Sequence, residues 1–320
     1  MKTEAREKRG QRELKGRLIG STYWDCTEAR RTRLASVEAV RMLLFAVVGK
    51  PVGHSLSPQM HRAAFRALGI EAEYLRVECE VQELGGLASA VRAGALHGVN
   101  ITIPHKRAAF ELADDASEEA RLLGVANTWV QDCGRVVAHN TDGAGFLMGL
   151  QEIELDPEGS AVVLGAGGAA RSISLALSRQ GREVTVLARR PQLVQESFRL
   201  LGADVLLWDG ESAARAARSA ALVVNATPVG MEPDTEAVPD FPLGNLRAGA
   251  VVYDIVYRPR RTAWLRAAEA KGLGTVDGVQ MLAGQGATSL ELWLGRPAPF
   301  SAMLAALETS LEKAPGDAPE

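Results

Sequence analysis

A glycine-rich turn between an apolar strand and a helix is the feature that most constrains the fold of this 320-residue chain. The apolar run Ser160 to Leu164 is followed at once by Gly165-Ala166-Gly167-Gly168-Ala169-Ala170. This is the G-x-G-x-x-G/A pattern in its strand–turn–helix setting, which binds a pyrophosphate on the amides of a helix N-terminus. Gly165 permits the tight turn, Gly167 permits close approach of the backbone, and Ala170 is small enough for helix–strand packing. We predict a dinucleotide site; a turn of purely structural value is the weaker alternative.

The next strand predicts which dinucleotide binds. It covers residues 183–188 and ends in Ala188-Arg189-Arg190. An NAD site usually has an acidic residue here that accepts hydrogen bonds from the ribose 2′-hydroxyl, and this stretch has none. Two guanidinium groups instead suit the 2′-phosphate of NADP through charge-assisted hydrogen bonds. We therefore predict NADP as the cofactor; two solvated arginines at a strand end are the alternative.

Short apolar runs alternate with helical patterns from Met42 onward, and this alternation predicts the fold class. One helix is bounded by Ser57 as its N-cap, Pro58 in its first turn and Gly69 after its last residue. Strands that alternate with helices are typical of α/β folds with parallel sheets. The length favours roughly two domains. The predicted strands lie at 43–49, 74–78, 97–102, 126–131, 135–138, 160–165, 183–188, 221–225, 250–255 and 274–276.

Composition restricts the partners. A net charge of −3 argues against nucleic acid and membrane surfaces, because both attract strongly basic proteins. No apolar run reaches the roughly 18 residues that a membrane span needs. Three cysteines without a C-x-x-C pair favour a reducing, cytoplasmic location, and five histidines without H-E-x-x-H predict no metal site. We expect a small-molecule substrate.

The two ends of the chain differ from the rest. Residues 1–41 are crowded with Arg, Lys and Glu, and they lack the apolar core of a secretory signal. Their acidic residues also disfavour a mitochondrial presequence. We expect 1–41 to be an N-terminal extension, disordered or non-native, with Met42 as the functional start. The polar tail 312–320 is expected to fray.

Polar residues at three predicted strand ends have no obvious structural purpose. Ser55 and Ser57 adjoin a helix N-terminus, where two hydroxyls could bind a carboxylate, although Ser57 is also explained as a helix cap. Lys106 and Asp142 follow two other strands, where each alone is typical of a solvated charge or a turn. Together, an ammonium and a carboxylate could form an acid–base pair that supplies a proton while a nicotinamide supplies a hydride.

These segments together resemble the shikimate/quinate dehydrogenase family. The matches occur in family order from about Met42 to Leu311, and the ordered set is more specific than any one of them. The matching stretches are Ser55 to Pro58, Asn100 to Lys106, Val125 to Thr128, Asn140 to Gly143, Gly165 to Ala169, Asn225 to Met231 and Asp277 to Leu282. The resemblance implies reversible, NADP-dependent reduction of the ketone of 3-dehydroshikimate to shikimate, in aromatic amino-acid biosynthesis.

The resemblance also implies a domain organisation. A substrate-binding domain would cover residues 42–143, and a Rossmann-like NADP-binding domain would cover residues 144–276. The C-terminal helices over 277–311 would then return to pack on the first domain. Both a monomer and a homodimer fit these expectations.

The resemblance assigns roles residue by residue. Lys106 and Asp142 look like the catalytic pair, and Ser55 and Ser57 look like the residues that hold the substrate carboxylate. The implied ring-hydroxyl contacts are Thr102, Asn127, Asp142, Tyr257 and Gln285. The implied cofactor contacts are Gly165, Ala166, Gly167, Gly168, Ala169, Arg189, Arg190, Ile255 and Gly278.

The chain departs from the family pattern at one place, and two alternative functions remain open. Many NADP-using relatives have Asn-Arg-Thr where this chain has Ala188-Arg189-Arg190. Arg189 keeps the cation, but Arg190 replaces a hydroxyl. The rivals are a quinate or dual quinate/shikimate dehydrogenase and a non-catalytic NADP-binding sensor. The presence of Lys106 and Asp142 disfavours the sensor.

Overall fold

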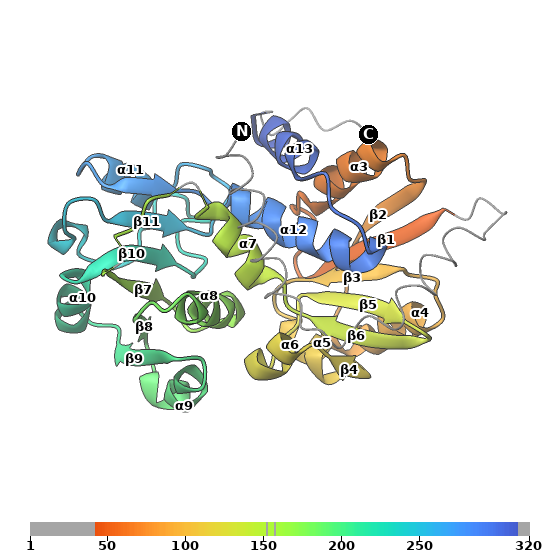
Figure 1. Ribbon diagram of the computed structural model, residues 1–320, viewed down its shortest axis with the longest axis horizontal. Helices are drawn as coiled ribbons and strands as arrows, with labels where there is room; N and C mark the ends of the chain where they lie inside the picture. Colours follow the sequence, from red (N-terminus) through yellow and green to blue (C-terminus); the bar gives the residue numbers. More distant parts are fainter. Residues whose placement is uncertain (1–41, 152, 157, 313–320) are drawn as a thin grey trace, which may run out of the picture. The chain divides into compact units, whose positions relative to one another are not determined.

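The computed structural model describes residues 42–151, 153–156 and 158–312, and within them the strands form two six-stranded sheets (Figure 1). The predicted extension 1–41 and all of the predicted tail except residue 312 lie outside the described residues. Within these ranges, no helix is both long and apolar enough to cross a membrane. The α/β class predicted from the alternation of strands and helices is confirmed.

The first sheet has the strand order β2-β1-β3-β5-β6-β4 and is mixed rather than parallel throughout. Strand β5 runs antiparallel to both of its neighbours, β3 and β6. The loop between β5 and β6 consists of Cys133 and Gly134, whose φ angles are 48° and 80°. A two-residue loop with two positive φ angles joins antiparallel strands only, so this part of the parallel prediction is wrong. The strands are β1 (Leu43–Gly49), β2 (Ala72–Glu78), β3 (Gly98–Ile101), β4 (Asp115–Ala116), β5 (Thr128–Asp132) and β6 (Arg135–His139).

The predicted helix after Ser55 is present, but its N-cap differs from the prediction. The cap position is Leu56, and no side chain caps the helix there. Ser57 is the first helical residue, and its hydroxyl lies 3.2 Å from that of Ser55. Gly69 ends the helix with a φ of 64°, as predicted. The helices that follow the strands of this sheet are α3 (Ser57–Leu68), η2 (Val81–Glu83), α4 (Leu84–Arg92), α5 (Lys106–Glu111), α6 (Glu118–Leu123) and α7 (Asp142–Gly149).

The second sheet is parallel throughout and has the strand order β12-β11-β10-β7-β8-β9. This is the doubly wound order of dinucleotide-binding folds, in which the strand order reverses between β7 and β10. The sequence analysis missed β4, which is two residues long, and β9, an edge strand with Asp204 and Leu207 exposed. The strands are β7 (Ser160–Leu164), β8 (Val184–Ala188), β9 (Ala203–Leu207), β10 (Ala220–Asn225), β11 (Val251–Asp254) and β12 (Gly274–Val276).

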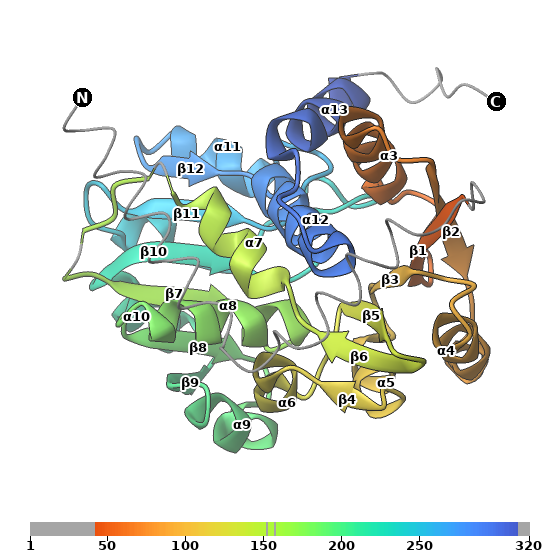
Figure 2. The same ribbon diagram turned by 45° about the vertical axis from the view of Figure 1, so that its right-hand side comes forward.

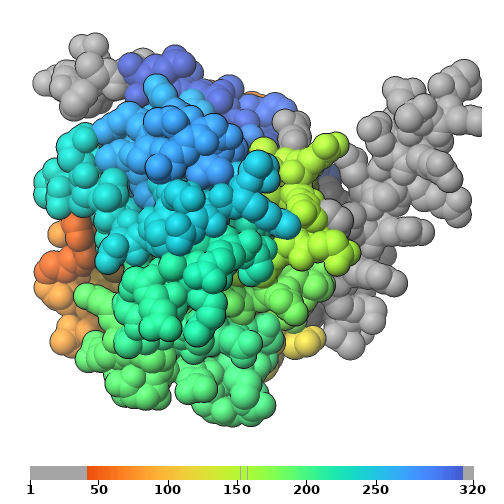
Figure 3. Space-filling view, turned by 90° about the vertical axis from the view of Figure 1, so that its left-hand side faces the viewer, coloured from red at the N-terminus to blue at the C-terminus, as the bar shows by residue number. Residues whose placement is uncertain are grey.

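Helices lie between the strands of the second sheet, and Figure 3 shows the surface that this part of the chain presents, coloured green to light blue. Its buried core contains Val163, Ile173 and Val186, all fully excluded from solvent. The helical segments are α8 (Gly168–Arg179), η3 (Pro191–Leu193), α9 (Gln195–Arg199), α10 (Gly210–Ala217), η4 (Leu243–Asn245) and α11 (Ala263–Glu269).

Two C-terminal helices return to the elements of the first sheet. Helix α12 (Val279–Leu294) contacts α7, α3 and β5, and α13 (Phe300–Glu312) packs beside α3 (Figure 2). The indole nitrogen of Trp293 on α12 donates to the carbonyl of Trp129 on β5 at 2.9 Å. Gly98 on β3 leaves room for that indole, because a Cβ there would overlap it.

The crossing of α7 and α12 brings two helix backbones into direct contact. A Cβ on Gly145 of α7 would lie 2.5 Å from the backbone nitrogen of Gln285 and 2.7 Å from the backbone carbonyl oxygen of Met281. A Cβ on Gly284 of α12 would lie 2.9 Å from the Cα of Gly145. Backbone atoms cannot move aside as a side chain can, so both positions require glycine.

We expect Gly145→Ala to lower the free energy of unfolding by about 1–3 kcal/mol, because the new methyl group overpacks the α7–α12 crossing. The measurement is urea denaturation followed by circular dichroism. Gly86→Ala in α4 is the matched control, because nothing lies within 4 Å of a Cβ there and its φ is not positive. The control should raise stability by about 0.5–1 kcal/mol. Equal midpoints for the two variants would contradict the close crossing.

Candidate active site

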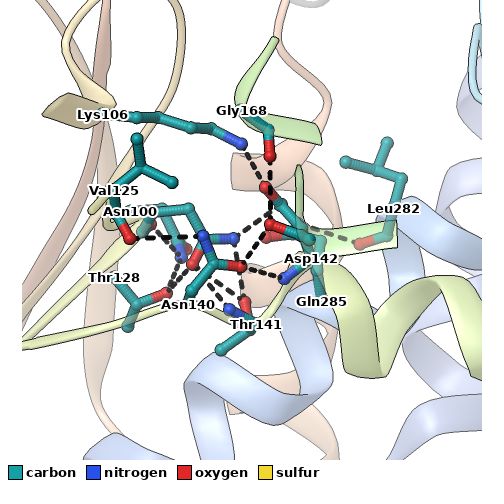
Figure 4. A network of polar contacts seen from close by, with 12 residues as sticks. Asn100, Lys106, Val125, Thr128, Asn140, Thr141, Asp142, Gly168, Leu282 and Gln285 are labelled. Carbon is teal, nitrogen blue, oxygen red and sulfur yellow. Dashed lines mark hydrogen bonds and ion pairs between the residues drawn. The ribbon is translucent and has the colours of Figure 1, made fainter. Parts of the chain in front are cut away.

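Lys106 and Asp142, predicted from separate strand ends, meet in an ion pair (Figure 4). Lys106 is the first residue of α5, shortly after β3, and Asp142 is the first residue of α7, shortly after β6. Their side chains are 18% and 6% exposed. Low exposure strengthens the interaction, and the remaining accessibility of Lys106 leaves one face open to a ligand. The pair can therefore exchange a proton with a bound molecule.

Asn127 holds the carboxylate of Asp142 in place. Its amide nitrogen donates to Asp142 Oδ1 at 2.7 Å and to the hydroxyl of Thr141 at 3.0 Å. Its side-chain oxygen, Oδ1, accepts from the backbone N–H of Thr141 at 2.8 Å and from the hydroxyl of Thr128 at 3.0 Å. With both ends of the amide satisfied, its orientation is determined. Asn127 thus binds Asp142 directly, besides the contact with the substrate ring that the resemblance implies.

A buried polar cluster supports Asn127 from behind. The amide nitrogen of Asn100 on β3 lies 3.1 Å from the hydroxyl of Thr128 and 2.9 Å from that of Ser289. The hydroxyl of Ser289 also lies 2.8 Å from that of Thr128 and 3.2 Å from that of Thr141. All four side chains are less than 5% exposed. Sequence reasoning missed Asn100 and Ser289 as site residues.

Tyr74 connects this cluster to Ser55 and Ser57, the serine pair. The hydroxyl of Tyr74 on β2 donates to Asn100 Oδ1 at 2.7 Å. Burial raises the pKa of Tyr74, and a hydrogen bond with Ser57 opposes that effect. Ser55 and Ser57 are 8% and 5% exposed, and the backbone N–H of Ser57 lies 3.3 Å from Ser55 Oγ. Two hydroxyls at the start of α3 can bind a carboxylate.

The other implied substrate contacts lie around these groups. Gln285 lies beside Asp142 in Figure 4, and its side-chain nitrogen donates to the carbonyl of Leu282 at 3.0 Å. Thr102 follows β3, and its backbone N–H donates to the carbonyl of Val48 at 2.8 Å. Tyr257 follows β11, and burial raises the pKa of its hydroxyl.

Two further titratable groups adjoin the site. His61 on α3 is fully buried and stacks on Tyr74 at 4.3 Å between ring centroids, and burial lowers the pKa of its imidazole to about 3. His61 is therefore neutral. Burial raises the pKa of Glu119 on α6, the guanidinium of Arg179 opposes this effect, and the charge of Asp142 adds to it. Glu119 and Arg179 lie 3.4 Å apart.

The glycine turn has the conformation that its sequence predicts. Gly165 has a φ of 99°, which favours glycine, and Ala170 is fully buried. Gly167 is the N-cap of α8, and nothing lies within 4 Å of a Cβ built there. The open space before a helix of 12 residues fits a pyrophosphate. Ala166 lies between the first two glycines, and Gly168 and Ala169 are the first two residues of α8.

The remaining implied cofactor contacts lie at the same edge of the sheet. Arg189 and Arg190 are exposed directly after β8, whose Leu187 pairs with Leu164 of β7. Neither arginine has an ion-pair partner among the described residues. Ile255 follows β11, and its carbonyl would overlap a Cβ on Gly278. These positions fit a dinucleotide that extends across the carboxyl ends of the strands.

The ion pair of Lys106 and Asp142 lies against this edge. A Cβ on Gly168, the first residue of α8, would lie 3.5 Å from Cδ of Lys106. The hydroxyl of Ser172 on α8 donates to Asn140 Oδ1 at 3.0 Å, two residues before Asp142. Within the described ranges, no group of three His, Cys, Asp or Glu residues is placed to hold a metal ion. The site therefore combines a Lys–Asp ion pair with the glycine turn and the start of α8.

Comparison with known proteins identifies relatives over most of the chain. The model of the shikimate dehydrogenase substrate binding domain matches residues 47–129, and that of the shikimate 5'-dehydrogenase C-terminal domain matches residues 278–308. Shikimate dehydrogenase (NADP(+)) of Symbiobacterium thermophilum is 44% identical over 281 residues, which cover 85% of this chain and 96% of that protein.

Solved structures of the same family also match this chain. Shikimate 5-dehydrogenase of Thermus thermophilus, in complex with NADP(H) and shikimate, matches with a TM-score of 0.77 and 42% identity, over 84% of this chain and all of that one. Quinate dehydrogenase of Corynebacterium glutamicum, in complex with NAD, matches with a TM-score of 0.75 and 31% identity, over 84% of this chain and 99% of that one. The chain therefore belongs to the shikimate dehydrogenase family.

Proposed function

We propose that this chain is an NADP-dependent shikimate dehydrogenase that reversibly reduces 3-dehydroshikimate to shikimate. The observation that carries the proposal is the Lys106–Asp142 ion pair, which lies beside the first residue of α8. A ketone reductase needs a proton donor next to a nicotinamide, and this arrangement supplies the donor at the end of a dinucleotide-binding helix. Family membership supports the same reaction.

The chain's own part in the reaction is to bind, orient and protonate the substrate. NADPH supplies the hydride when it is bound. Lys106 Nζ donates a proton to the oxygen that was the ketone, and it takes the proton back in the reverse direction. Asp142 orients Lys106, and Asn127 fixes Asp142 through its 2.7 Å hydrogen bond. Asp142 Oδ2 faces Lys106 while Oδ1 faces Asn127, so the carboxylate cannot rotate without losing one of its partners.

The substrate is held at two ends. Ser55 and Ser57 bind its carboxylate, and Thr102, Asn127, Asp142, Tyr257 and Gln285 contact its ring hydroxyls. The buried hydrogen bonds through Tyr74 and Asn100 support both ends. A rigid connection of this kind favours one ring orientation, because hydroxyls and amides with fixed partners cannot adapt to another.

The cofactor is held along the edge of the second sheet. Gly165, Ala166, Gly167, Gly168 and Ala169 contact the pyrophosphate, and Ile255 and Gly278 line the site toward the nicotinamide. Arg189 and Arg190 bind the 2′-phosphate. Two exposed guanidinium groups directly after β8, without acidic partners among the described residues, support NADP over NAD.

We further propose domain boundaries and a location. The substrate-binding domain covers residues 42–143, the NADP-binding domain residues 144–276, and helices α12 and α13 over 277–311 complete the first domain. A cytoplasmic location fits the free thiols of Cys79 and Cys133. The chain acts on a small molecule as a monomer or homodimer, and nucleic acid and membranes are not its partners.

The direct test is turnover by the purified chain. With shikimate and NADP, absorbance at the NADPH band should rise, and shikimate with NAD should be the weaker combination. The same assay with quinate tests the second candidate, which the similarity to a quinate dehydrogenase favours. Faster turnover of quinate than of shikimate would replace the proposed substrate, and no turnover of either would contradict a dehydrogenase.

We expect Lys106→Ala to lower kcat by about 10²–10⁴-fold while KM for shikimate changes little, because the variant loses the proton donor rather than the binding groups. Steady-state kinetics with NADP measures both constants. Arg107→Ala is the matched control, because Arg107 is an adjacent but exposed cation that pairs with Glu111. A variant at position 106 that keeps most of its kcat would overturn the role of Lys106.

We expect Arg189→Ala to raise KM for NADPH by about 10- to 100-fold and to change KM for NADH far less, because only NADPH carries the phosphate that the guanidinium binds. The reduction of 3-dehydroshikimate with each cofactor measures this. Arg218→Ala, which removes an exposed cation after α10, is the control. Equal effects on the two cofactors would refute the assignment of Arg189.

A further inference from the structure

Arg76 on β2 lies against the loop that carries the serine pair. Its Nε donates to the backbone carbonyl oxygen of Ser55 at 2.9 Å, and its Nη2 donates to the same oxygen at 2.7 Å. Nη2 also lies 3.0 Å from Oε1 of Gln59 on α3. Three hydrogen bonds fix the guanidinium beside the residue whose hydroxyl faces Ser57.

No acidic side chain pairs with Arg76 among the described residues. The neighbouring Arg62 is paired with Glu73, and Arg92 of the same domain is paired with Asp114. The groups that act on the pKa of Arg76 are a cation, Arg62, and the hydroxyl of Tyr257, in addition to burial, which lowers it. Arg76 is thus an exposed cation that three hydrogen bonds hold in place, without a counter-ion among the described residues.

Ser55 and Ser57 supply hydroxyl and amide donors but no charge. Moving a carboxylate from water into a site with neutral donors alone is costly, and a nearby guanidinium offsets that cost. Arg76 forms hydrogen bonds with Ser55 and Gln59. Besides Arg62, the hydroxyl of Tyr257 acts on the pKa of its guanidinium. Of these neighbours of Arg76, Ser55 and Tyr257 are substrate contacts in the proposed function.

We propose that Arg76 determines specificity for a carboxylate substrate, by supplying the positive charge that the serine pair lacks and by fixing the carbonyl of Ser55. The inference rests on the proposed function and adds a residue to it. Arg76 acts at the carboxylate end of the site, whereas Lys106 and Asp142 act at the carbonyl end. Its loss should therefore weaken binding of the acid without slowing the chemical step.

The test compares shikimate with its methyl ester, which has the same ring but no charge, in the wild type, Arg76→Gln and Arg76→Lys. Kinetics gives kcat and KM, and titration calorimetry gives the Kd of each compound independently of turnover. For Arg76→Gln we expect a loss of about 10- to 100-fold in affinity and kcat/KM for the acid, a change of less than about threefold for the ester, and a nearly unchanged kcat. Arg76→Lys should recover part of the affinity for the acid.

The control is Arg66→Gln, which removes an exposed cation from the last turn of α3. If net charge alone matters, Arg66→Gln and Arg76→Gln will have equal effects, and the inference fails. Equal losses for acid and ester in Arg76→Gln would reduce Arg76 to a support of the Ser55 loop, and unchanged binding of the acid would remove it from the site. A wild type that binds shikimate without turning it over would contradict the proposed function and not the role of Arg76.

Discussion

The contact between the backbones of α7 and α12 fixes the geometry of the whole site. Helix α7 begins with Asp142, and α12 carries Gln285 and Ser289, so the distance between the two helices determines how far these side chains lie from one another. Gly145 and Gly284 allow that distance to be short. Larger residues at these two positions would push the helices apart and move Gln285 and Ser289 away from Asp142.

A buried polar network lies behind the Lys106–Asp142 pair. Tyr74, Asn100, Thr128 and Ser289 are nearly inaccessible to solvent, yet each hydroxyl or amide has partners. Buried polar groups that are fully satisfied specify one arrangement, because any other leaves a donor or an acceptor without a partner. The network thus gives Lys106 and Asp142 a rigid background, and Arg76 extends the set of fixed polar groups beyond Ser55.

Local signals predict the parts of the fold that short segments determine. The turn after β7 needs a positive φ at Gly165 and a small residue at Ala170, and both requirements are visible in the sequence. The antiparallel direction of β5 depends on a two-residue turn at Cys133 and Gly134, which lacks the usual Asn-Gly or Asp-Gly signal. The predicted cap role of Ser57 is wrong, because the helix begins at Ser57 itself. Ser289 could not be predicted, since its partners Asn100 and Thr128 lie 189 and 161 residues away in the chain.

The return of α12 to the first sheet has a consequence for how the protein is made. The residues proposed to bind the substrate extend from Ser55, early in the described chain, to Gln285, near its end. Such long-range contacts form late, because the intervening segment must be ordered first. While the ribosome is still adding residues, the N-terminal strands can pair and the second sheet can assemble, but Asn100 and Thr128 still lack their partner Ser289. The buried polar network is therefore complete only once α12 has been synthesised and has packed against α7 and β5.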